Sequence, residues 1–213
     1  MQFNTFLESV VKIKHLNLFG EESHAKMSPP YRLELAVKMK EKVKTAKTAA
    51  VLALFYPSET NETYLVLILR KTYKGVHSAQ VGFPGGKYED EDNDLMLTAL
   101  RETEEEVGVN RTMVNVIKTI SPLYIPPSNF IVHPYMAVSE YKLKFKKQDE
   151  EVEEIIEVKL QDFLNEANRI TTKVSTSYNV KVEVPAFKLN GHIVWGATAM
   201  MLGEIKDLLK QVL

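Results

Sequence analysis

Residues 82–109 read GFPGGKYEDEDNDLMLTALRETEEEVGV, and this stretch carries the strongest signals in the chain. It opens with two adjacent glycines, Gly85 and Gly86. Glycine adopts backbone angles that are closed to other residues, so the main chain there can approach a ligand or a metal closely. A run rich in acidic residues follows over 89–94. The stretch therefore begins as a tight loop beside a high density of negative charge.

A short helix is expected after the acidic loop. Asp94, or Asn93 before it, can cap a helix that begins near Leu95, because its side-chain oxygen can accept a hydrogen bond from a free amide of the first turn. Gly108 supplies the stop, since glycine readily enters the left-handed conformation that ends helices. The sequence thus predicts a helix that fills the space between these two signals.

Three glutamates of this helix are spaced to share one face. At about 100° per residue, Glu105 falls about 60° to one side of Glu102, and Glu106 falls about 40° to the other. The expected apolar stripe of the helix consists of Met96, Leu100, Thr103 and Val107. We expect the three carboxylates to point well away from this stripe.

Carboxylates at these spacings repel one another, by roughly 0.2–0.5 kcal/mol per pair on an exposed helix. Arg101 offsets only part of this repulsion, whereas a divalent cation would offset all of it. Oxygen ligands without cysteine or paired histidine favour Mg²⁺ or Mn²⁺ over zinc. Magnesium is usually held by few carboxylates and by substrate phosphates, so the pattern predicts a metal site for a phosphate substrate. A plain acidic interaction helix would not explain the preceding Gly-Gly pair.

The composition of the 213-residue chain narrows the class of protein. With 45% hydrophobic residues it can bury one sizeable core. Its net charge of -1 creates no basic field for nucleic acid. The absence of cysteine excludes disulfides, thiolate catalysis and cysteine-bound zinc. We see no signal peptide and no apolar run of membrane-spanning length, so we expect a cytoplasmic protein that binds neither membranes nor nucleic acid.

The rest of the chain predicts a mixed α/β (α+β) fold in which helices flank a mixed sheet. Residues 1–45 read as two helices around a loop, an N-terminal helical extension to a domain over residues 46–213. Residues 141–147 alternate lysine with apolar residues, as an edge strand guarded by lysines would. The first two of the other strands form a hairpin. Those strands are 49–56, 64–69, 114–120, 131–138, 180–187 and 192–195, and the further helices are 160–167 and 197–213.

Residues 101–109, RETEEEVGV, resemble the second half of the Nudix box, R-E-U-x-E-E-x-G-U, with Thr103 where an aliphatic residue is usual. The box places its glycine fourteen residues before the arginine, at Lys87 here, whereas Gly86 lies fifteen residues before it. The loop is thus one residue longer, as in the coenzyme A pyrophosphatase branch of the family. Asp92 lies near the place of the box's first glutamate.

Three further stretches resemble the same branch, and together they extend the resemblance over residues 48–213. Upstream, Arg70 precedes the motif VGFPGG of residues 81–86. Residues 127–130, PSNF, resemble the branch's middle loop, and residues 194–199, VWGATA, resemble its segment I-W-G-x-T-A.

The upstream motif departs from that branch at two positions. The branch carries an arginine at the place of Gly75 and a glycine at the place of Ala79. Lys74 is adjacent to the first of these and can replace the arginine as a phosphate contact, with less geometric discrimination. The implied substrate-binding residues are therefore Arg70, Phe83 and Lys74.

The resemblance implies a Nudix-like α/β/α sandwich with a mixed, mainly antiparallel sheet. It implies a Mg²⁺- or Mn²⁺-dependent hydrolase of phosphoric anhydride bonds, whose substrate is a small nucleoside diphosphate derivative. For the coenzyme A branch, the products are 3′,5′-ADP and 4′-phosphopantetheine. Arg101 would orient the glutamates, and Glu105, Glu151 and Glu154 are alternative general bases. The implied metal ligands are Glu102, Glu105, Glu106 and the carbonyl of Gly86.

Two other functions stay open on the sequence. The chain can be a Nudix pyrophosphatase for ADP-ribose, nucleotide sugars, dinucleotides or nucleoside triphosphates. It can also be a module that senses a nucleotide without cleaving it, although such modules typically lose box carboxylates and this chain keeps all three. A monomer and a homodimer both fit the sequence.

Overall fold

The computed structural model describes residues 1–39, 41–72, 79–175 and 181–213, and it is built around one mixed sheet. The strands of this sheet are β1 (Lys47–Pro57), β2 (Thr63–Arg70), β3 (Val81–Gly82), β4 (Gly85–Lys87), β5 (Asn115–Thr119), β6 (Leu123–Ile125), β7 (Phe130–Val138) and β8 (Val152–Lys159). The main path of the sheet is β3-β2-β1-β7-β5, and β4, β6 and β8 pair with β1, β7 and β2.

The pairing of these strands is mainly antiparallel, as predicted. Within the described residues, β1 and β7 form the one parallel pair, with Ala49 opposite Val132. β1 and β2 form the predicted hairpin, with Phe55 opposite Leu65. β8 was not predicted, because its glutamates hide the apolar side chains that face the core.

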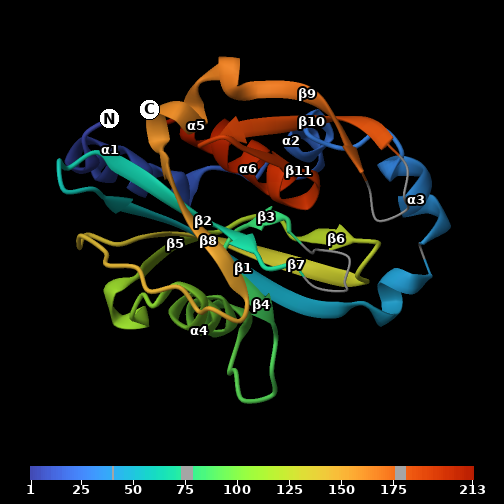
Figure 1. Cartoon of the computed structure of the whole chain (residues 1–213), viewed down its shortest axis with the longest axis horizontal. Coiled ribbons are helices and arrows are strands. Elements are labelled where there is room, and N and C mark those ends of the chain that lie inside the picture. Colours follow the sequence, from blue (N-terminus) through green and yellow to red (C-terminus); the bar gives the residue numbers. More distant parts are fainter. Residues whose placement is uncertain (40, 73–78, 176–180) are drawn as a thin grey trace.

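Helices cover both faces of this sheet, which confirms the predicted sandwich (Figure 1). Successive side chains of a strand point to opposite faces, so β1 supplies two cores. Leu52 and Leu54 belong to the core beneath α4 (Leu95–Val107), whereas Ala53 and Phe55 belong to the larger core on the other face.

A second, antiparallel sheet of β9 (Arg169–Ser175), β10 (Lys181–Leu189) and β11 (His192–Trp195) packs on the larger core. In Figure 1, β9 and β10 lie above α6 (Gly196–Leu209). The order of this sheet is β11-β10-β9, and the sequence predicted two of its strands but not β9, whose side chains are half-buried or exposed. No helix in the described ranges is long and apolar enough to cross a membrane. The elements of this region are α5 (Leu160–Leu164), η4 (Glu166–Asn168), β9 (Arg169–Ser175), β10 (Lys181–Leu189), β11 (His192–Trp195) and α6 (Gly196–Leu209).

The N-terminal residues form three short α-helices and two 3₁₀ turns rather than two longer helices. Phe3 and Phe6 of the first helix are buried in the larger core, and the ring of Phe6 lies 5.2 Å from that of Phe55. The N-terminal segment therefore shares the core of the sheet. Its elements are α1 (Phe3–Val10), η1 (Val11–His15), α2 (Glu21–Lys26), α3 (Arg32–Lys38) and η2 (Lys42–Thr45).

The prediction of an edge strand over residues 141–147 is wrong. The amide of Lys146 donates to the Val107 carbonyl at 3.0 Å, so this backbone is bound to the end of α4 and not to a strand. Leu143 and Phe145 pack against the core beneath α4. The alternation of apolar residues thus reflects side chains that face the core from an irregular segment.

Candidate active site

Both predicted ends of α4 are confirmed. Asp94 Oδ1 accepts a hydrogen bond from the Leu97 amide at 2.8 Å and caps the helix. Gly108 ends the helix in the left-handed conformation, with φ at 73°. These caps fix which residues face β4, the short strand that contains Gly85 and Gly86.

Glu106 is buried, with 1% of its surface exposed. Its Oε2 accepts a hydrogen bond from the Gly85 amide at 2.8 Å. Its Oε1 has no hydrogen-bond partner among the described residues, and Arg70 Nη2 approaches it only to 3.6 Å. Glu106 thus lies against β4, and solvent does not reach it.

Glu102 lies against the other glycine of β4. A side chain added at Gly86 would bring its Cβ within 2.3 Å of the Glu102 carboxyl carbon. At Gly85, where φ is 145°, an added Cβ would lie 2.3 Å from the Ala50 carbonyl oxygen of β1. The Gly-Gly pair therefore allows helix, strand and sheet to approach closely.

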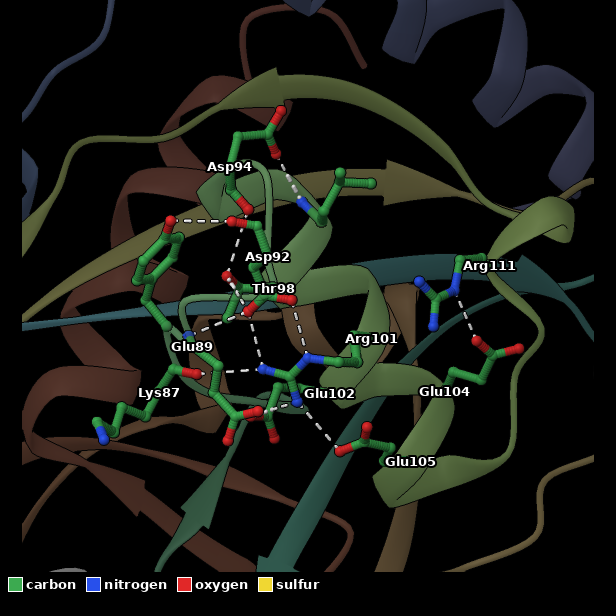
Figure 2. A network of polar contacts seen from close by, with 12 residues as sticks. Lys87, Glu89, Asp92, Asp94, Thr98, Arg101, Glu102, Glu104, Glu105 and Arg111 are labelled. Atoms are coloured by element: carbon green, nitrogen blue, oxygen red, sulfur yellow. Dashed lines mark hydrogen bonds and ion pairs between the residues drawn. The ribbon is translucent and has the colours of Figure 1, made fainter.

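Arg101 binds the acidic loop to the glutamates of α4 (Figure 2). Its Nε and Nη2 donate to the two carboxylate oxygens of Asp92, each at 2.9 Å. Its Nη1 donates to Glu102 at 3.1 Å and to Glu105 at 3.2 Å. Its Nη2 also donates to the Lys87 carbonyl at 3.3 Å. Arg101 therefore contacts Asp92 and two of the three glutamates, and its role in orienting them stays a prediction.

Asp92 is the residue whose part the sequence did not predict. It is buried, and besides Arg101 it accepts hydrogen bonds from the Thr98 hydroxyl at 2.8 Å and the Glu89 amide at 3.2 Å. Hydrogen bonds from Arg101 hold the pKa of Asp92 well below its usual range. The sequence did contain one signal for Asp92, because this residue lies near the position of the first glutamate in the Nudix box that the chain resembles.

The pKa values of Glu102 and Glu106 shift in the opposite direction from that of Asp92. Burial raises the pKa of Glu106 to about 7, and the charges of Glu102 and Glu151 act in the same direction. Burial also raises the pKa of Glu102, to which Glu105 and Glu151 add. Burial is the largest cause at both residues and the nearby carboxylates add to it, so the site holds acidic groups close together in a buried position.

A divalent cation fits this donor set chemically. The described residues contain no group of three carboxylate or histidine side chains already arranged around a metal position. Arg101 holds Glu102 and Glu105 through a single nitrogen, while Glu106 keeps a buried oxygen without a partner. Hard oxygen donors with an uncompensated charge suit Mg²⁺ or Mn²⁺.

The candidate bases differ in their surroundings. Among Glu102, Glu105 and Glu106 of α4, Glu105 is the most exposed, with 56% of its side chain accessible. Glu151 is close enough to raise the pKa of both Glu102 and Glu106. Glu154 lies on β8, where His192 Nε2 approaches its carboxylate at 3.3 Å.

A cavity of about 290 Å³ adjoins β4. The motif residues 81–86, 127–130 and 194–199 are far apart in the sequence but meet at this cavity. Phe83, Ser128 and Trp195, one from each motif, all contribute to its wall. Arg70 lines it as well, and its Nη2 donates to the Gly85 carbonyl at 2.7 Å. Lys74, the other expected substrate contact, lies outside the described residues, as does Gly75. The charged residues in the described lining are all basic: Arg32, Arg70 and Lys87.

The chain resembles known proteins in sequence and in fold. The NUDIX domain model matches residues 46–176. The chain is 29% identical over 161 residues to the mitochondrial Nudix hydrolase 15 of Arabidopsis thaliana, covering 73% of this chain and 56% of the relative. It is 34% identical over 128 residues to the mitochondrial coenzyme A diphosphatase NUDT8 of Mus musculus, covering 60% of this chain and 61% of the relative.

The solved structure of a MutT/nudix family protein from Enterococcus faecalis has the same fold. Its TM-score is 0.51 at 18% identity, over 78% of this chain and 62% of that one. The alignments to the two relatives span only 56% and 61% of their length, so they compare part of each protein.

Proposed function

The chain belongs to the NUDIX family, and on that premise we propose that it is a divalent-metal-dependent pyrophosphohydrolase of coenzyme A or its derivatives. Its products would be 3′,5′-ADP and 4′-phosphopantetheine, or the acyl form of the latter. The observation that carries the proposal is the buried, unpartnered oxygen of Glu106 beside Glu102, next to a cavity whose described charged lining is basic. The name of the mouse relative and the motif residues in the cavity wall support coenzyme A as the substrate.

We assign the metal to the acidic face of α4. Mg²⁺ or Mn²⁺ would be held by Glu102, Glu105 and Glu106, with the carbonyl of Gly86. An ion bound there neutralises charge on the diphosphate and acidifies a water molecule. The oxygen of Glu106 that lacks a hydrogen bond supports this assignment, because a buried carboxylate oxygen without a hydrogen bond is costly and Arg70 approaches it only to 3.6 Å.

The chain's own residues would bind the diphosphate and receive a proton. Arg70 lies between the cavity and Glu106, where a guanidinium can bind phosphate oxygens. Attack of water on one phosphorus breaks the bridging P–O bond, and the leaving phosphate oxygen takes the electron pair. We propose Glu151 as the group that accepts the proton of water, because its charge is near enough to raise the pKa of both Glu102 and Glu106. Glu105 and Glu154 are the alternatives.

Carboxylate-to-amide variants of α4 test the metal assignment. We expect Glu102→Gln or Glu106→Gln to lower the rate of diphosphate cleavage in Mg²⁺ by at least about 100-fold, because a metal ligand is lost. Glu104→Gln is the matched control, since Glu104 is on the same helix but pairs with Arg111. Its rate should stay within about threefold of the parent. Equal rates in all three variants would contradict the assignment.

A substrate panel tests the rest of the proposal. Coenzyme A, its thioesters, ADP-ribose and dinucleoside polyphosphates are incubated with Mg²⁺, and the products are separated by chromatography. Release of 3′,5′-ADP from coenzyme A at the highest kcat/KM of the panel supports the proposal. A higher kcat/KM with another diphosphate would identify that compound as the preferred substrate. Binding without turnover of any compound would indicate a nucleotide sensor.

A further inference from the structure

Part of the cavity wall comes from outside the segment that matches the family. Pro29, Tyr31, Arg32 and Leu35 line the cavity, although the family match begins at residue 46. These residues belong to α3 and the turn before it. The N-terminal segment therefore adds an apolar surface and one charged group to a cavity whose remaining walls come from the sheet and the C-terminal region.

Arg32 is held in place at the cavity by one backbone group. Its Nη2 donates to the Tyr124 carbonyl of β6 at 2.6 Å. No carboxylate of the described residues forms an ion pair with it, and its surface is only partly exposed. A guanidinium has five N–H donors in a planar fork, so one hydrogen bond leaves much of its capacity for a ligand.

A neutral side chain would suffice for the bond to Tyr124. Burial lowers the pKa of Arg32, which means that removal from water disfavours its charge. A guanidinium stays charged in proteins nonetheless, and the interaction with Tyr31 offsets only part of this cost, because the pKa remains lowered. The desolvated charge is therefore better explained by ligand binding than by the attachment of α3 to β6.

Arg32 and Arg70 both line the cavity, but they are bonded to different strands of the sheet. Arg70 is bonded to β4, and Arg32 is bonded to β6. The strands between them lie in the order β4-β1-β7-β6, since β4 and β7 both pair with β1 and β6 pairs with β7. Three spacings of roughly 4.8 Å separate these backbones by about 14 Å. A ligand that meets both cations must therefore carry two separated anionic groups.

We infer that Arg32 binds a second anionic group of the substrate, apart from the diphosphate, and thereby determines which diphosphates are selected. This assignment rests on the proposed function, in which the diphosphate lies between Arg70 and the glutamates. The second anion is a phosphate monoester on the nucleoside or a carboxylate on the group esterified to the other phosphate. Both would form charge-assisted, bidentate hydrogen bonds with the guanidinium.

Ligand binding to the 213-residue chain in the presence of a chelator tests this role without turnover. By titration calorimetry we expect 3′,5′-ADP to bind about tenfold or more tightly than 5′-AMP, and Arg32→Gln to abolish that difference. Arg32→Lys should retain part of it. Arg111→Gln is the matched control, because this arginine pairs with Glu104 away from the cavity. Each variant is first checked for an unchanged thermal unfolding midpoint.

A second pair of ligands distinguishes the source of the anion. If the preference for malonyl- over acetyl-coenzyme A is lost in Arg32→Gln, and the nucleotide preference is not, the anion is a carboxylate on the acyl group. The role of Arg32 would be overturned if both affinity ratios, 3′,5′-ADP to 5′-AMP and malonyl- to acetyl-coenzyme A, were unchanged in Arg32→Gln. It would also be overturned if the parent bound the two ligands of each pair equally well. Failure to hydrolyse any diphosphate would instead overturn the proposed function, because these affinities do not depend on hydrolysis.

Discussion

Among single residues, Glu106 differs most between sequence and structure. On a helical wheel it is one of three equivalent glutamates, yet it alone is fully buried and lacks a partner for one oxygen. Its neighbour Glu105 is half-exposed and bonded to Arg101. The difference arises because β4 passes over one end of the acidic face.

This burial predicts a pH-dependent stability for the metal-free protein. The pKa of Glu106 is about 7, above its ordinary value of 4.5, so between these values the folded state binds more protons than the unfolded state. The free energy of unfolding should therefore fall as pH rises through this window. Glu106→Gln should remove about 2–3 kcal/mol of that fall, measured by urea unfolding at about pH 5 and about pH 8.

Glu104→Gln is the comparison for this measurement, because Glu104 is partly exposed and paired with Arg111. Its fall in stability between the two pH values should equal that of the parent. If Glu106→Gln showed the same fall as the parent, the buried carboxylate would not be the titrating group.

At the scale of elements, the contact between α4 and β4 forms the site. The two glycines of β4 meet different neighbours: Gly85 faces the backbone of β1, and Gly86 faces the movable carboxylate of Glu102. Backbone cannot give way cheaply, whereas the end of a side chain can. The same substitution should therefore have different effects at these adjacent positions.

Gly85→Ala should destabilise the fold by roughly 3 kcal/mol or more, from a backbone clash and a φ of 145°. Gly86→Ala should cost less than about 1 kcal/mol but displace Glu102, so that the half-saturating Mg²⁺ concentration rises about tenfold. Urea unfolding and metal titration of activity measure the two effects. Gly82→Ala is the stability control, since an added Cβ there meets nothing closer than 3.9 Å. Equal destabilisation at Gly85 and Gly82 would contradict this explanation.

At the scale of the whole molecule, the segments outside the family match complete both the core and the cavity. α1 places Phe3 and Phe6 in the larger core, and α3 supplies part of the cavity wall. From the other end of the chain, Trp195 and Thr198 reach the same cavity. The N-terminal segment is thus part of the structure that surrounds the ligand.

Phe6→Ala tests whether α1 unfolds together with the sheet. Phe6 is fully buried against Phe3 and Phe55, so its truncation should cost about 3–5 kcal/mol in urea unfolding. Val11→Ala nearby should change stability by less than about 0.5 kcal/mol, because 48% of Val11 is exposed. A loss below about 1 kcal/mol for Phe6→Ala would mean that α1 is not part of the cooperative core.

Features that depend on residues close together in the chain could be predicted from the amino-acid sequence. Asp94 and Gly108 mark the two ends of α4 as predicted, because a cap involves only residues within a few positions of the helix end. The hairpin of β1 and β2 followed from two apolar runs around a turn. The alternation in residues 141–147 misled, because apolar side chains can also face a core from an irregular segment.

Which segments cover each side chain depends on the packing of the folded chain. It buried Glu106, gave Asp92 its partners and brought Arg32, Phe83 and Trp195 to one cavity. Burial and charge compensation depend on segments that are far apart in the sequence and meet only when the sheet is assembled. A local pattern therefore identifies which groups can act, and packing determines their environment.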